Sequence, residues 1–76
     1  MDKKEFLENF ASQFDDTDAS EITFETKFHD LDEWSSLIGM SIIAMSKVSY
    51  NKTISGSELK ACETVEDVYK LIVSKS

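Results

Sequence analysis

The spacing of apolar residues predicts where the chain is helical. Near its start, apolar side chains recur three or four positions apart, which predicts an amphipathic helix from about Asp2 to Phe14 with a strongly aromatic face. The residues on this face are Phe6, Leu7, Phe10 and Phe14.

The stretch that follows, residues 15–35, has no sustained helical period. Apolar residues still recur often enough to hold it against a core, and these are Ile22, Phe24, Phe28 and Leu31. A loop of about twenty residues is unusual in a small domain and is usually functional or disordered. The apolar anchors favour an ordered loop.

A second helix is predicted from Ser36 to about Tyr50. One apolar face at helical spacing consists of Leu37, Met40, Ile43, Ala44 and Val48, and it is widened by Ile38, Ile42 and Met45. Because more than half of its circumference is apolar, this helix either lies at the centre of the bundle or presents apolar surface to another molecule.

Two capping patterns predict the remaining helices. Ser55 lies three residues before Glu58, the spacing of a capping box, and begins a short third helix that ends at about Ala61. Thr64 and Asp67 repeat this arrangement ahead of the last helix. The apolar residues of that helix are Val65, Val68, Tyr69 and Ile72. The predicted fold is all-α, a small four-helix bundle with a long loop between the first and second helices, in a single domain spanning residues 1–76.

The interior of this bundle is expected to be small, because a domain of this size buries only about 60% of the surface that its unfolded chain exposes. The residues expected to line it are Phe6, Phe10, Phe14, Phe28, Met40, Ile43, Met45, Tyr69 and Ile72. Methionine is a deformable filler that could yield to an acyl chain, although a stripe of this kind normally just packs. Cys62 reads as a small packing residue, and His29 as a loop residue with a hydrogen bond.

Composition narrows the class of protein. The 76 residues are 41% hydrophobic with no proline and one cysteine, which suits a compact helical protein without an internal disulfide. No stretch reaches the length needed to cross a bilayer, so we expect no membrane insertion. The first ten residues carry scattered charges instead of the apolar core of a secretory leader, so we expect a cytoplasmic protein.

The charge is acidic and unevenly distributed. A formal net charge of -7 argues against nucleic acid as a partner, because phosphates would repel the chain. Carboxylates crowd residues 15–33, whereas residues 36–54 contain none and carry Lys47 and Lys52. The acidic segment is either a solvated loop or a surface that steers basic partners.

The sequence "LDEWSSL", Leu31 to Leu37, places two serines where the second helix begins. Ser35 lies at the N-cap, where a side-chain oxygen accepts a backbone N–H that the first turn cannot pair internally. Ser36 then takes the first helical position with its hydroxyl outward, at the positive end of the helix dipole. An attached anion would be stabilised there. The alternative is that both serines serve the helix terminus and nothing more.

The chain shows no catalytic apparatus of its own. It has one histidine, no G-x-S-x-G elbow, no glycine-rich phosphate loop and no metal-spaced His/Cys cluster. A hydrolase would have to build its triad from Ser35 or Ser36, His29 and an acid in a shielded cleft, which so small a bundle can hardly provide. We therefore expect a protein that is not an enzyme.

The order of elements and the serine motif resemble the acyl carrier protein family. Its members share a first helix, a long loop, an Asp-Ser-Leu tripeptide that opens the second helix, a short third helix and a fourth. In "LDEWSSL" the residues Leu31, Trp34, Ser36 and Leu37 match, and "TIS" and "TVEDVYKLI" resemble the closing segments of the family. The similarity covers nearly the whole chain.

The resemblance implies that Ser36 receives a 4'-phosphopantetheine arm from coenzyme A through a phosphopantetheinyl transferase. Acyl groups would ride on the arm as thioesters and be passed among acyl-transferring or synthase enzymes of fatty-acid or specialised acyl and polyketide-type biosynthesis. The residues expected to cap the helix and meet these partners are Trp34, Ser35, Leu37 and Met40. Trp34 would be either a hydrophobic staple or a contact for the arm. We expect a monomer.

One departure from the family is Ser35, which stands where the family has aspartate. A serine still caps the helix, but the charge that helps partner enzymes to dock is lost, and the second helix adds no other carboxylate. This leaves open a specialised set of partners, docking through the acidic loop and first helix, or a helical interaction module that is never modified. An aminoacyl or peptidyl carrier is a further option, although "LDEWSS" lacks the glycine-rich lead of those relatives.

Overall fold

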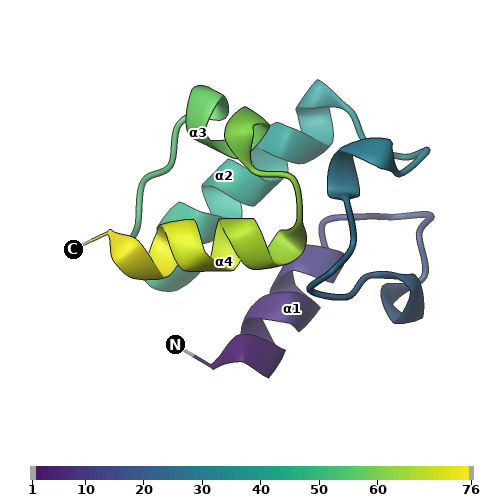
Figure 1. The fold of residues 1–76 in the computed structure, drawn as a ribbon, viewed down its shortest axis with the longest axis horizontal. Coiled ribbons are helices and arrows are strands. Elements are labelled where there is room, and N and C mark those ends of the chain that lie inside the picture. Colours follow the sequence, from purple (N-terminus) through teal and green to yellow (C-terminus); the bar gives the residue numbers. More distant parts are fainter. Residues whose placement is uncertain (1, 76) are drawn as a thin grey trace.

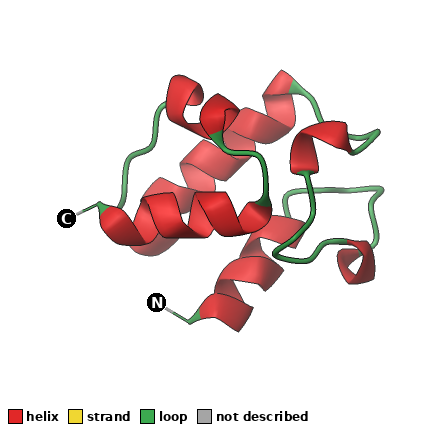
Figure 2. Ribbon diagram, in the orientation of Figure 1, coloured by secondary structure: helices red, strands yellow, loops and turns green. Residues whose placement is uncertain are grey.

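Four α-helices make up the regular structure of residues 2–75, which are the residues that this computed structural model describes (Figures 1 and 2). They are α1 (Lys3–Ala11), α2 (Ser36–Tyr50), α3 (Gly56–Ala61) and α4 (Val65–Ser74). The described residues contain no strand, so the predicted all-α fold with a long first loop and a short third helix is confirmed. Residues 1 and 76 of the predicted domain lie outside the described part.

The first helix ends earlier than predicted. It stops at Ala11 instead of Phe14, because the backbone tightens into i to i+3 hydrogen bonds. Gln13 N–H donates to the Phe10 carbonyl at 3.1 Å, and Phe14 N–H to the Ala11 carbonyl at 3.0 Å. Phe14 therefore stays on the aromatic face and is buried.

Aromatic rings from α1, the long loop and α4 form much of the core. Phe6 meets Tyr69 of α4 edge to face at 5.4 Å between ring centroids, and Phe10 meets Phe28 of the loop in the same way at 5.5 Å. Phe6, Phe10, Phe28 and Ile72 are fully buried, as expected. Helix α1 packs against both α2 and α4, and α3 packs against α2.

The orientation of α2 corrects one prediction. The core face consists of Ile38, Ile42 and Met45, whereas Leu37, Met40 and Val48 are 73%, 66% and 84% exposed. Met40 therefore does not line the bundle interior, and Leu37 is not on the inward face. The pattern was ambiguous because this helix is apolar over more than half of its circumference, so only the helices packed against it select the face that is buried.

The long loop is ordered and anchored. It contains two short 3₁₀ turns, Ala19–Glu21 and Phe28–Asp30, that its sequence did not predict. Ile22 and Phe28 are buried, and Phe24 and Leu31 pack against the core, as expected. Backbone N–H groups at the start of α4, from Val65 and Glu66, donate to loop carbonyls at 3.2 and 3.0 Å, so α4 holds the loop directly.

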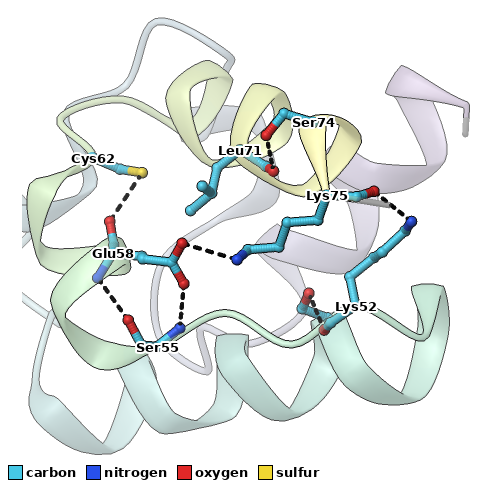
Figure 3. A network of polar contacts seen from close by, with 8 residues as sticks. Lys52, Ser55, Glu58, Cys62, Leu71, Ser74 and Lys75 are labelled. Atoms are coloured by element: carbon cyan, nitrogen blue, oxygen red, sulfur yellow. Dashed lines mark hydrogen bonds and ion pairs between the residues drawn. The ribbon is translucent and has the colours of Figure 1, made fainter.

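Helix α3 is fixed by its cap and by the end of α4 (Figure 3). Glu58 both closes the capping box with Ser55 and pairs with the Lys75 ammonium at 2.9 Å. Lys52 Nζ donates to the Lys75 carbonyl at 2.6 Å. These contacts join the α2–α3 connection to the C-terminal end of α4 and so set the position of α3 against α2.

Candidate functional site

The N-terminus of α2 has the arrangement predicted for the two serines. Ser35 is the N-cap, with extended backbone, and its hydroxyl accepts the Ile38 N–H at 3.3 Å. Ser36 is the first helical residue and is exposed. Its hydroxyl makes no hydrogen bond to the described part of the chain, so it is free to react.

Trp34 takes the position of a hydrophobic staple, with a glycine as its partner. It directly precedes the N-cap, and its ring lies over Gly39 in the second turn of α2. A Cβ atom at Gly39 would lie 3.4 Å from Trp34 Cη2, an ordinary van der Waals distance, so the ring lies directly on this part of the helix. The indole also packs edge to face on Phe28 at 5.0 Å and on His29 at 4.8 Å.

A pocket of about 430 Å³ opens beside Ser36, between α2, α3 and the end of the long loop. Its apolar wall consists of Trp34, Met40, Ile43 and Leu59. The remaining lining residues are His29, Ser36, Gly39, Gly56 and Lys60. The predicted residues Trp34, Ser36 and Met40 therefore meet in one hollow. Ser35 and Leu37 do not line it, and Leu37 points to the exposed surface.

Several lining residues were not predicted as site residues. Gly56, Leu59 and Lys60 come from α3, whose sequence showed only its cap and its length. No local signal identifies them, because they reach the serine only through the packing of α3 on α2. Both glycines of the chain, Gly39 and Gly56, also line the pocket, and only the structure shows that they lie together.

His29 differs from its prediction. It was expected to make a hydrogen bond, but its Nε2 atom is buried and has no hydrogen-bond partner in the described part of the chain. The imidazole instead lies against two aromatic rings, those of Phe28 at 4.3 Å and Trp34 at 4.8 Å. It therefore packs against the indole, and within residues 2–75 it makes no hydrogen bond to a serine or an acid.

The start of the long loop is tied to the residue before Trp34. The Glu33 carboxylate accepts hydrogen bonds from the backbone N–H groups of Asp15, Asp16 and Thr17 at 2.6, 3.0 and 2.8 Å and from the Thr17 hydroxyl at 2.8 Å. Desolvation raises the pKa of Glu33, but these hydrogen bonds favour the ionised form and bring the pKa below its ordinary value. The ionised Glu33 carboxylate thus ties residues 15–17 to the segment that directly precedes Trp34.

Cys62 is a packing residue, as expected. It is buried behind α3, and its thiol donates to the Glu58 carbonyl at 3.4 Å. Burial raises the pKa of the Cys62 thiol, and the nearby charges of Asp67 and Glu58 add to the effect. A buried thiol with a raised pKa is a poor nucleophile, and Cys62 does not line the pocket beside Ser36.

Other kinds of site receive no support in residues 2–75. No group of three or more His, Cys, Asp or Glu side chains among them could hold a metal ion. None of their helices has both the length and the apolar character that crossing a membrane requires.

Comparisons of the chain with models of known protein families, with curated proteins and with solved structures gave no significant match.

Proposed function

We propose that this chain is a carrier protein in which Ser36 holds a 4'-phosphopantetheine arm. The observation that supports this most is the exposed hydroxyl of Ser36 at the first position of α2, where Ser35 already serves the cap. An ester phosphate there would lie beside the unpaired N–H groups of the first turn. The adjoining pocket offers apolar surface to whatever extends from the serine.

Ser36 supplies only a nucleophilic oxygen in the loading step. The transferase removes the proton of the Ser36 hydroxyl, and the oxygen forms a bond to the phosphorus that bears the pantetheine group in coenzyme A. The bond from that phosphorus to the oxygen that bridges the two phosphates of coenzyme A breaks, and adenosine 3',5'-bisphosphate leaves. When bound, the arm supplies a thiol on which acyl groups are carried as thioesters. The chain is acted on by its partners and is not itself an enzyme.

The surface around Ser36 suits partners that recognise apolar side chains. Leu37 and Met40 project from α2 and are largely exposed, and no carboxylate lies on this helix. Apolar residues at a protein interface contribute affinity that salt screens little, whereas charge pairs mainly raise the association rate. We propose that the transferase and the acyl-transferring or synthase enzymes bind this surface of a monomeric, cytoplasmic carrier.

The test is the intact mass of the protein after incubation with coenzyme A, magnesium and a broad-specificity phosphopantetheinyl transferase, followed by peptide mapping. The expected result is one phosphopantetheine increment on Ser36. Ser36→Ala should abolish the increment while leaving the helical circular dichroism unchanged. Ser35→Ala is the matched control, because it removes the neighbouring hydroxyl and should still be loaded.

An interaction module that is never modified is the second candidate, and the exposed apolar residues of α2 favour it equally. It would be supported if the transferase added nothing and material isolated from the native cell were also unmodified. Loading that Ser35→Ala abolished and Ser36→Ala did not would show that the attachment residue is misassigned by one. If the chain is loaded, the mass of the native thioester would identify the cargo and distinguish acyl from aminoacyl groups.

A further inference from the structure

The pocket beside Ser36 has a charge opposite to that of the whole molecule. The chain carries a formal charge of -7, yet no aspartate or glutamate lines this pocket, and its two ionisable residues are His29 and Lys60. A second hollow shows the contrast, because it is lined by Asp16, Glu21, Asp32 and Glu33. The acidic side chains of the molecule therefore lie outside the lining of the pocket beside Ser36.

The ammonium group of Lys60 is available to a ligand. Lys60 lies in the last turn of α3 and is exposed. It takes part in none of the ion pairs or hydrogen bonds found among residues 2–75. Five other lysines have partners: Lys3 and Lys70 pair with Glu66, Lys75 pairs with Glu58, Lys52 donates to the Lys75 carbonyl, and Lys47 donates to Asn51. The side chains of Lys4 and Lys27 also have no partner among residues 2–75, but neither lysine lines this pocket.

The rest of the pocket suits an apolar chain. Trp34, Met40, Ile43 and Leu59 form its wall, and its volume of about 430 Å³ falls within the range of small-ligand sites in proteins. Gly56 leaves open space at its edge, since a Cβ atom there would meet nothing within 4 Å. An apolar wall with one free cation and no carboxylate is complementary to an amphipathic anion.

We propose that this pocket binds a small amphipathic anion, an apolar chain that ends in a carboxylate, and that Lys60 is the residue that makes it prefer the anion. The net charge of the molecule opposes this only weakly, because charges farther away than about 8 Å are largely screened at physiological ionic strength. Lys60, at the pocket itself, is not screened in this way. The inference concerns the unmodified chain and does not require the arm on Ser36.

The experiment compares three ligands of equal chain length, octanoate, octanol and octylammonium, titrated into the unmodified full chain at pH 7. Gly39 and Gly56 are the only glycines and both line the pocket, so their two amide signals in an ¹⁵N–¹H NMR spectrum report its occupancy. Fluorescence of the single tryptophan, Trp34, gives an independent reading. The expected order of affinity is octanoate, then octanol, then octylammonium, with both glycine signals shifting to saturation.

Two variants isolate the contribution of Lys60. Lys60→Glu should weaken octanoate binding by about threefold to tenfold and place octylammonium ahead of octanoate. Lys70→Glu is the matched control, because it makes the same change of charge on α4, away from the pocket, and should preserve the original order. Met40→Ser should weaken all three ligands, since it removes apolar wall without changing charge.

Equal affinities for octanoate and octanol in the natural chain would overturn the proposal. So would an order that Lys60→Glu leaves unchanged, or octanoate binding that moves neither glycine signal. The titrations use a chain without the arm, so they are independent of loading. Octanoate binding by a chain that is never loaded on Ser36 would support this inference and contradict the carrier function. A chain that is loaded on Ser36 but shows no preference for octanoate would support the carrier function and overturn this inference.

Discussion

At the scale of single residues, the contact between Trp34 and Gly39 shapes the site. Glycine inside a helix normally costs about 0.5–1 kcal/mol relative to alanine, because it loses more backbone freedom on folding. In α2 the indole ring rests on the helix at Gly39, next to Ser36. The same indole is a wall of the pocket and rests on Phe28 and His29.

Gly39→Ala is expected to be tolerated and to stabilise the protein. The added Cβ would meet Trp34 Cη2 at 3.4 Å and Leu59 Cδ2 at 3.6 Å, both ordinary van der Waals contacts. The gain in helix propensity should therefore raise the free energy of unfolding by up to about 1 kcal/mol. Urea denaturation followed by circular dichroism measures this. A loss of stability would mean that the indole cannot adjust even slightly.

At the scale of elements, each helix begins with a side chain that accepts a backbone N–H of its first turn. These N-caps are Asp2, Ser35, Ser55 and Thr64, and the last two form complete capping boxes. At Ser35 the cap has a second effect, since it fixes the turn on which Ser36 projects. The cap, Ser35, and the proposed attachment residue, Ser36, are thus adjacent but separate residues at the start of α2.

Replacements at Ser35 should separate stability from loading. Ser35→Ala should lower the free energy of unfolding by about 1 kcal/mol, because one N–H of the first turn loses its acceptor. Ser35→Asp should restore the cap, add a negative charge at the positive end of the dipole, and speed loading by a generic transferase.

The control for this series is Ser49→Ala, at an exposed serine of the same helix whose hydroxyl makes no hydrogen bond in the described residues. Thermal unfolding and the initial rate of loading are the two readouts. An unchanged rate for Ser35→Asp would remove the argument that the missing charge slows partner docking.

At the scale of the whole molecule, carboxylates join segments that lie far apart in the sequence. Glu33 ties the start of the long loop to its end, and Glu58 ties α3 to the end of α4. Hydrogen bonds from Lys75 and Ser55 hold the pKa of Glu58 below its ordinary value, and backbone hydrogen bonds from Thr64 and Glu63 do the same for the pKa of Asp67. Each of these groups is stabilised in its ionised form by folding.

Acid should therefore destabilise the fold. Because the pKa of Glu33, Glu58 and Asp67 is lower in the folded chain, the unfolded chain takes up protons first as the pH falls. Their stabilising contribution is complete above the ordinary values of 4.5 for Glu and 3.8 for Asp and is lost as the pH drops through the folded values.

Urea denaturation between pH 3 and pH 7 measures this slope. Glu33→Gln should be less stable at pH 7 and should show a shallower loss in acid, because one of the shifted groups is gone. Protonation also relieves repulsion among the fifteen acidic residues, which acts in the opposite direction. A Glu33→Gln slope equal to that of the natural chain would mean that Glu33 does not link the loop to folding.

The candidate site was only partly predictable. Ser35, Ser36 and Trp34 were identified because they are adjacent in the sequence and their roles depend on the first turn of one helix. Met40 was expected near the function and lines the pocket, but it was also expected in the interior, where it does not lie. Lys60, which belongs to another helix, could not be linked to Ser36 from the sequence.

The sequence by itself determined the four helices and the caps at Ser35, Ser55 and Thr64, because these depend on residues at most four positions apart or on a period of 3.6 residues. Its apolar anchors indicated an ordered loop, but hydrogen bonds to Glu33 and to α4, which join distant residues, hold that loop in place. Only the tertiary structure decided which side of α2 is buried. A helix that is apolar over more than half of its circumference has no single preferred side until α1 and α3 pack against it. The pocket was decided in the same way, because its residues come from the loop, α2 and α3 and meet only when those segments close over a shared core.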